Sequence, residues 1–197
     1  MPTGGGKSMC YQLPAVLMDG ITLVISPLIA LMRDQVDSLN SNGIPATYLN
    51  SSLTAAEERA IEQQLERGDF KLLYISPERV FAPNFMSFLS ILPIQLIAID
   101  EAHCVSSWGH HFRPEYQKLH YLKKQLPHVT TIALTATADK AVRSDIGELL
   151  GMIEPVTFIS SFDRPNLSLS VLQGQKKWEQ IQRIIQKYNN KSGIIYC

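Results

Sequence analysis

The sequence predicts an α/β domain of three layers, in which a mostly parallel β-sheet is covered by helices on both faces. Strand-like and helix-like segments alternate along the chain, as expected of parallel strands joined by crossover helices. The strand-like segments are short apolar runs rich in β-branched residues, without the polar alternation of a half-exposed strand, so both of their faces should be buried. In such sheets ligands bind at the carboxyl ends of the strands. The residues that follow each strand are therefore the first candidates for a functional site.

The individual elements follow from apolar spacing and capping residues. We expect the first helix over residues 8–18, with Met9, Leu13, Val16 and Leu17 at helical spacing. Ser26 and Pro27 are the expected N-cap and first residue of a helix that runs through residue 42 and ends at Gly43. Thr54 and Glu57 form a capping box for a helix over residues 54–66, which Gly68 should end. Strands are expected at residues 21–25, 71–75, 96–99 and 130–134, and one further helix at 138–150.

Composition is that of an ordinary globular protein. Of the 197 residues 45% are hydrophobic, so the chain can bury a sizeable core. Lysine plus arginine equals aspartate plus glutamate at 18 each, so net charge does not indicate a nucleic-acid partner, and any such contact must come from a local patch. Three widely spaced cysteines, and the lack of a signal peptide or a membrane-length apolar run, predict a soluble intracellular protein.

The stretch at residues 2–8, Pro-Thr-Gly-Gly-Gly-Lys-Ser, predicts a phosphate-binding loop. Consecutive glycines let the backbone approach a ligand, so that amide groups and the next helix N-terminus point at phosphate oxygens. Lys7 would reach the β- and γ-phosphates of ATP, and the Ser8 hydroxyl would hold Mg²⁺. The alternative is a flexible glycine turn with a solvated lysine, and one departure from the full motif is Met1 at a position that calls for a small residue. The predicted nucleotide ligands are Thr3, Gly4, Gly5, Gly6, Lys7 and Ser8.

Two adjacent acids follow the buried run at 96–99. In a nucleotide hydrolase the first, Asp100, would hold Mg²⁺, and the second, Glu101, would accept a proton from the attacking water. An Asp-Glu pair after a strand can instead be a helix N-terminus that places acids on the helix dipole. The phosphate loop about ninety residues upstream favours the hydrolytic interpretation.

Together, these motifs closely resemble the RecQ family of DNA helicases over essentially the whole chain. The stretches that carry the resemblance are 2–14, 26–35, 76–79, 100–103, 108–116, 134–138 and 162–167. The resemblance implies a RecA-like P-loop NTPase lobe at residues 1–165, lacking its N-terminal segment, and a linker with a truncated start of the second lobe at 166–197. It also implies ATP-driven 3′ to 5′ unwinding of duplex DNA in repair or recombination, with single-stranded and duplex DNA as partners, in the cytoplasm or, in a eukaryote, the nucleus. The fragment alone is expected to be inactive.

The stretch at 108–116 is similar to the aromatic-rich loop of that family. Trp108 and Phe112 beside Arg113 could stack bases and contact phosphate, although core packing is the commoner fate of aromatic residues. The resemblance also places Arg33, and Asn50 with Ser51 at a strand end, among the DNA contacts. His111 stands where the family ordinarily has an acid.

His103 is expected to form a hydrogen bond between the acidic pair and Thr135 or Thr137, and so to couple nucleotide state to the DNA side. The alternative is a zinc site, because His103, Cys104, His110 and His111 cluster in the sequence, but their spacing is wrong for structural zinc. Two other functions remain open: a DEAH-type RNA helicase, which shares residues 100–103, and a non-catalytic module switched by ATP. The aromatic loop disfavours the first of these and Glu101 disfavours the second.

The tail at 166–197 should contain two strands, at 168–172 and 193–196. Between them we expect a helix at 178–188, with Ile181, Ile184 and Ile185 facing inward.

Overall fold

The computed structural model of the chain describes residues 1, 4–108, 111–160, 166–174 and 176–196. The chain divides into two compact units, residues 1–162 and 163–197. Within the described ranges, none of the helices has both the length and the apolar character required to cross a bilayer.

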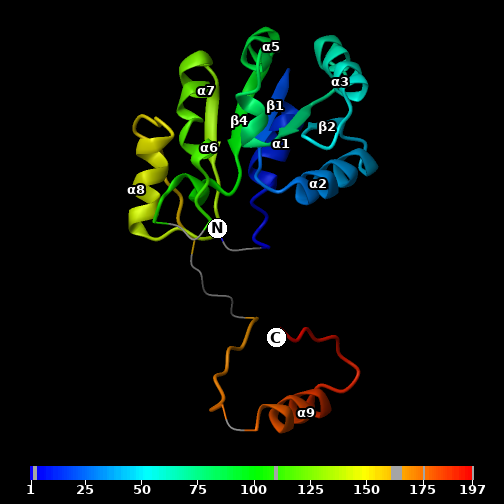
Figure 1. The fold of residues 1–197 in the computed structure, drawn as a ribbon, viewed down its shortest axis with the longest axis vertical. Helices are drawn as coiled ribbons and strands as arrows, with labels where there is room; N and C mark the ends of the chain where they lie inside the picture. Colours follow the sequence, from blue (N-terminus) through cyan, green and yellow to red (C-terminus); the bar gives the residue numbers. More distant parts are fainter. Residues whose placement is uncertain (2–3, 109–110, 161–165, 175, 197) are drawn as a thin grey trace. The chain divides into compact units, whose positions relative to one another are not determined.

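The first unit is built on a five-stranded sheet in which all neighbouring strands are parallel (Figure 1). Its strands are β1 (Ile21–Ile25), β2 (Ala46–Leu49), β3 (Leu72–Ile75), β4 (Ile94–Ile99) and β5 (Thr130–Ala133), in the order β2-β3-β1-β4-β5. Successive residues of β1 enter different layers, since Leu23 and Ile25 pack in one cluster and Val24 in the other. The predicted parallel three-layer α/β fold is therefore confirmed.

Helices cover the sheet in two separate clusters. Buried residues of α1 (Met9–Leu17) and α2 (Ile29–Ser41) pack on one face, whereas those of the middle of the chain pack on the other. The elements of this second layer are α3 (Ala55–Arg67), α4 (Pro77–Val80), α5 (Phe85–Ile91), the 3₁₀ helix η1 (Ala102–Val105), α6 (Pro114–Gln117), α7 (His120–Gln125) and α8 (Lys140–Leu149). The carboxyl ends of the strands all lie at one edge of the sheet. The elements that follow β1, β4 and β5 from that edge are α2, η1 and α8 respectively.

The capping signals at α3 are confirmed and those at α2 are not. Thr54 and Glu57 form the complete capping box, and Gly68 ends α3 in the left-handed conformation. The prediction of Ser26 as the N-cap of α2 is wrong, because Leu28 takes that position. Ser26 still belongs to the sheet edge, where its N–H donates to the carbonyl of Ile75 at 3.1 Å.

The second unit contains α9 (Lys177–Lys187), which overlaps the expected helix, but neither expected strand forms within its described residues. Strands at 168–172 and 193–196 were wrong predictions: a strand requires a partner, and the described part of this unit offers none. Ile184 and Ile185 were expected to face inward but are 47% and 58% exposed, because no second layer covers them there.

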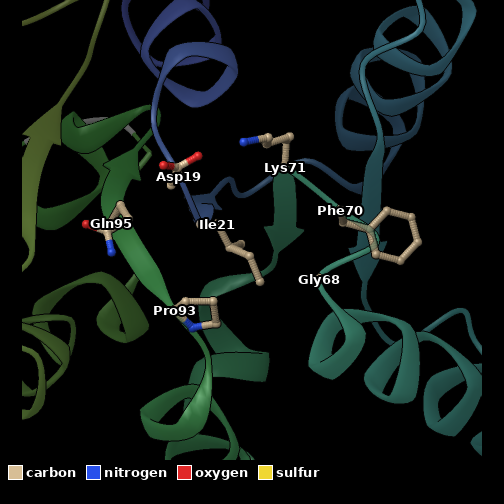
Figure 2. Close-up of a pocket in the computed structure, with 8 residues that line it drawn as sticks. Asp19, Ile21, Gly68, Phe70, Lys71, Pro93 and Gln95 are labelled. Atoms are coloured by element: carbon tan, nitrogen blue, oxygen red, sulfur yellow. The ribbon is translucent and has the colours of Figure 1, made fainter.

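A pocket of about 340 Å³ opens at the other edge of the sheet, where β1, β3 and β4 begin (Figure 2). Asp19, Lys71 and Gln95 are among its lining residues. The Lys71 ammonium is already used, since it donates to the carbonyl of Met18 at 2.8 Å. The pocket lies at the edge opposite to the predicted catalytic groups, so it belongs to the scaffold rather than to the candidate site.

Candidate functional site

The glycine run forms an exposed loop that leads directly into α1. Gly4 and Gly6 have φ values of +75° and +77°, which only glycine adopts readily, and no atom would lie within 4 Å of an added Cβ at either. The first helical bonds run from Met9 N–H to the Gly6 carbonyl and from Cys10 N–H to the Lys7 carbonyl, each at 3.0 Å. An open loop with a helix at its end has the geometry that phosphate recognition requires.

Ser8 and Lys7 remain available for a ligand. Ser8 occupies the N-cap position of α1, but its side chain makes no capping hydrogen bond. Lys7 is half-buried and lies close enough to the acidic pair that its charge lowers the pKa of both Asp100 and Glu101, though it is not the main influence on either. The structure thus brings the loop to the edge where β4 ends. Thr3, also predicted as a nucleotide ligand, lies outside the described residues.

The strand β4 delivers Asp100 to the carboxyl edge. Its backbone N–H donates to the carbonyl of Ile25 at 2.9 Å, and its Oδ1 accepts from the N–H of Glu101 at 2.9 Å. Burial raises the pKa of Asp100 above its ordinary value, and the hydrogen bond from Glu101 partly offsets that effect. A half-buried carboxyl group whose charged form is disfavoured by burial is one that a nearby cation would stabilise.

Glu101 has a left-handed backbone, with φ of +48°, which is uncommon for a residue with a side chain. This conformation turns the chain out of β4 and into η1, where Ala102 N–H donates to the carbonyl of Leu134 at 2.9 Å. The hydrogen bond with His103 is the main cause that lowers the pKa of Glu101 below its ordinary value. A backbone held in this sparsely populated region is characteristic of functional sites.

His103 joins the acidic pair to the segment after β5, which is the contact expected from the sequence. Its Nδ1 lies 3.2 Å from Oε2 of Glu101 and 2.8 Å from Oγ1 of Thr135. Thr137 is linked to the imidazole only through Thr135. The hydroxyl of Thr135 donates to the carbonyl of Thr137 and accepts from its N–H, each at 3.1 Å. Hydrogen bonds with Cys104 and then Glu101 raise the pKa of His103 to about 9, so the ring is cationic at neutral pH.

The aromatic loop is anchored at its base and exposes its tryptophan. Arg113 N–H donates to the carbonyl of Cys104 at 2.9 Å, which closes the loop, and Tyr116 Oη donates to the carbonyl of Asp100 at 2.9 Å. Trp108 is 80% exposed, so the core-packing alternative does not hold for it, and Phe112 is 38% exposed. The contact of Tyr116 with Asp100 was not predicted from the sequence. The one indication was that Tyr116 is the last residue of the stretch that resembles the family's aromatic loop.

The remaining predicted DNA contacts differ in exposure. Arg113 lies 3.7 Å from Glu78 of α4, and Arg33 is exposed on α2 with its guanidinium 6.0 Å from the Tyr48 ring centre. Ser51 is exposed.

Asn50, also predicted as a DNA contact, is only 1% exposed. Its Oδ1 accepts from the N–H and the hydroxyl of Ser52 at 2.9 and 2.6 Å, so this side chain shapes the turn after β2 and does not reach the surface. Ser51 and Ser52 are the exposed residues of this turn, and the DNA contact of Asn50 stays a prediction.

Metal-binding side chains do not gather into a protein-only site: among the described residues, which leave out His110, no group of three or more His, Cys, Asp or Glu is placed to hold an ion. The groups at the loop suit Mg²⁺ in another way. Magnesium is usually held by one or two carboxylates together with substrate phosphates and water. Asp100 and the free hydroxyl of Ser8 fit that pattern.

Residues 1–144 match the DEAD/DEAH box helicase family. Over all 197 residues the chain is 52% identical to the "ATP-dependent DNA helicase RecQ" of Pasteurella multocida, of which it covers 31%, and 50% identical to the protein of that name from Haemophilus influenzae, of which it covers 32%. It is 45% identical to the RecQ helicase of Bacillus subtilis, with 33% of that protein covered. The chain thus spans about a third of the length of these relatives.

Solved structures show the same fold. The helicase domain of Pyrococcus furiosus Hef superposes with a TM-score of 0.58 at 23% sequence identity, covering 78% of this chain and 32% of the other. The helicase MrfA bound to DNA and AMPPNP superposes with a TM-score of 0.59 at 20% identity, covering 77% and 23%.

Proposed function

This chain belongs to the DEAD/DEAH box helicase family, and we propose that it is the nucleotide-binding lobe of a RecQ-type helicase that couples ATP hydrolysis to the unwinding of duplex DNA. The observation that carries the proposal is one cluster at the carboxyl edge of the sheet. There Lys7, Asp100 and Glu101 interact electrostatically, and His103 extends the cluster to Thr135. The exposed Trp108 lies in the next loop of the chain.

The phosphates of ATP would lie along the loop at 4–8, facing its amide groups and Lys7. Ser8 and Asp100 would hold Mg²⁺, which when bound supplies a positive charge that stabilises the transferring phosphoryl group. Glu101 would orient the attacking water and accept its proton. In the structure its carboxylate is engaged by the cationic His103, which lowers its basicity, so release of that contact would make Glu101 a better base.

The aromatic loop would sense DNA. The exposed face of Trp108 suits base stacking, and the cation of Arg113 suits phosphate. By analogy with the relatives named RecQ, we propose 3′ to 5′ movement on single-stranded DNA and a role in repair or recombination. Such a protein would work where chromosomal DNA lies, in the bacterial cytoplasm or in a nucleus.

We propose that residues 1–197 alone hydrolyse ATP slowly. Phosphoryl transfer in this mechanistic class gains about 10³- to 10⁵-fold in rate from an arginine finger. None of the groups assembled at the described site supplies one, and the chain spans about a third of its relatives. In a two-lobe helicase the second lobe would provide that arginine.

The test is made on the full-length protein. We expect ATP hydrolysis that is stimulated by single-stranded DNA, and unwinding of a duplex with a 3′ single-stranded tail in preference to one with a 5′ tail. A matched RNA duplex is the control for the RNA helicase alternative. Hydrolysis without any DNA stimulation, or preferential unwinding of RNA, would overturn the proposal.

A further inference from the structure

Ser106 is a buried polar residue at the start of the aromatic loop, and its hydroxyl makes two hydrogen bonds. It is 0% exposed. Its Oγ donates to Oδ2 of Asp145 at 2.6 Å and accepts from the backbone N–H of Trp108 at 3.2 Å. The side chain of Ser106 therefore connects the backbone of the exposed Trp108 to a half-buried carboxylate on another element.

That element is α8, yellow in Figure 1, which packs against η1. The helix begins directly after the segment that contacts His103: Asp139 caps α8 by accepting from the N–H of Val142 at 2.9 Å, only two residues after Thr137. A very short connection therefore joins α8 to Thr135 and Thr137.

Two side-chain hydrogen bonds therefore link the stretch from η1 to Trp108 with the segment at 135–145. One link is His103 to Thr135 at 2.8 Å, and the other is Ser106 to Asp145 at 2.6 Å. The first reaches the proposed base Glu101, whereas the second reaches Trp108. His103 lies within the 3₁₀ helix η1 and Ser106 directly follows it, so only Cys104 and Val105 separate the two linked residues.

We propose that Ser106 and Asp145 are a positioning pair that couples the aromatic loop to α8 and through it to the Glu101–His103–Thr135 contact. This inference rests on the proposed function. When a DNA base stacks on Trp108, the pair transmits the shift of the loop to the 135–139 segment and so to the imidazole that holds Glu101. Neither residue touches ATP or DNA; both act through the groups they position.

The strength of the contact suits this role. A hydroxyl that donates to a carboxylate forms a short, charge-assisted hydrogen bond, about twice as strong as a neutral one. Because Ser106 is fully buried, the loss of Asp145 would leave its hydroxyl without this acceptor and the loop without a fixed point. The backbone N–H of Trp108 would then still donate to Ser106, but the hydroxyl of Ser106 would no longer be held by α8.

The experiment is a double-mutant cycle in the full-length protein: Ser106→Ala, Asp145→Ala and both together. We expect each single variant to reduce the DNA-stimulated kcat by about tenfold, with the KM for ATP and the DNA-independent rate within about twofold of wild type. The double variant should be no worse than either single one, because the two residues act as a unit. Asp145→Asn keeps an oxygen acceptor for Ser106 and should recover most of the stimulation.

The matched control is Ser144→Ala, which removes an exposed hydrogen bond to Glu148 on the same helix and should change nothing. A second readout is the part of the tryptophan fluorescence that is lost in Trp108→Phe, which single-stranded DNA should quench more strongly in wild type than in Asp145→Ala. If wild type shows no DNA stimulation at all, the proposed function fails and this inference with it. If wild type is stimulated but the single variants are equally stimulated, or lose both rates in parallel, the positioning role alone is overturned.

Discussion

The imidazole of His103 and the hydroxyl of Thr135 lie 2.8 Å apart, although they follow different strands, β4 and β5. The other contacts of the two side chains decide which of them donates the hydrogen bond. Thr135 gives its hydroxyl proton to the carbonyl of Thr137, so the imidazole must be the donor, and its Nδ1 proton is shared with Glu101 at 3.2 Å. A single ring thus holds the proposed base and the segment after β5 at once.

Removing the Thr135 hydroxyl should uncouple the two sides of this contact. Thr135→Val keeps the shape of the side chain but cannot accept from His103, so we expect DNA-stimulated kcat to fall about 5- to 10-fold, equivalent to about 1 to 1.4 kcal/mol. DNA-independent hydrolysis should stay within about twofold of wild type. Thr130→Val, at the exposed start of β5, is the control. A parallel fall of both rates would mean that Thr135 supports the fold rather than the coupling.

The stability of this chain should depend on pH through His103. Hydrogen bonds with Cys104 and Glu101 raise the folded-state pKa from 6.5 to about 9, so the folded chain holds this proton more tightly than the unfolded chain does. The resulting stabilisation is complete below about pH 6.5 and is lost as the pH rises through about 9. Urea unfolding at about pH 6, 7.5 and 9.5 should show a steeper loss in wild type than in His103→Gln. His128→Gln, at an exposed site, should match wild type, and identical slopes for all three proteins would contradict the assignment.

His111 should limit the stimulation by DNA. Its ring packs edge-on against His103 with a centroid distance of 5.9 Å, in a position where a carboxylate could pair with the imidazolium. His111→Asp would draw His103 away from Glu101 and leave the base free, so we expect a higher DNA-stimulated rate with unchanged ATP affinity. His111→Asn, which adds no charge, is the control. An unchanged or lower stimulated rate in His111→Asp would count against this explanation.

The sequence predicted those parts of the fold whose cause is local or periodic. Buried apolar runs located β1, β3, β4 and β5, and the capping box at Thr54 is complete within four residues. The short helices α4 to α7 escaped prediction because four to seven residues are too few to show a helical period. The tail strands were wrong because apolarity alone does not provide a pairing partner. The N-cap prediction for Ser26 was wrong because α2 begins later, at Ile29, with Leu28 at the N-cap.

For the candidate site, the sequence could indicate which side chains are functional, but not most of the residues with which they form hydrogen bonds. The contact between His103 and Thr135 is one of the two that were predicted, the other being a contact with Thr137. The contact between Ser106 and Asp145 spans 39 residues, and neither residue type is diagnostic by itself. Burial of Asn50 was equally hidden, since a polar residue at a strand end is ordinarily exposed.

Gly20 should be the glycine least tolerant of substitution in the described scaffold. It has φ of +107°, and an added Cβ would overlap the carbonyl oxygen of Pro93, which accepts the first bond of β1 beside the pocket of Figure 2. We expect Gly20→Ala to lower the free energy of unfolding by about 3 kcal/mol. Gly43→Ala is the matched control: φ is +75° with open space around the Cβ, so only the left-handed backbone costs about 1 kcal/mol. Equal losses in urea unfolding would show that the clash is relieved by movement of Pro93.

Lys7 and Glu101 should separate nucleotide binding from turnover. Lys7→Ala removes a charge that would contact phosphate, so the Kd for ATP should rise at least about tenfold. Glu101→Gln keeps the shape of the side chain but removes the proton acceptor, so ATP binding should be retained while kcat falls by about 10² to 10⁴. Both are measured in the full-length protein, by fluorescent-nucleotide titration and by single-turnover hydrolysis. The Glu101→Gln substitution also removes the ion pair with His103, so a His103→Gln variant is needed beside it to separate that loss from the loss of the base. Wild-type turnover in Glu101→Gln would show that another group accepts the proton.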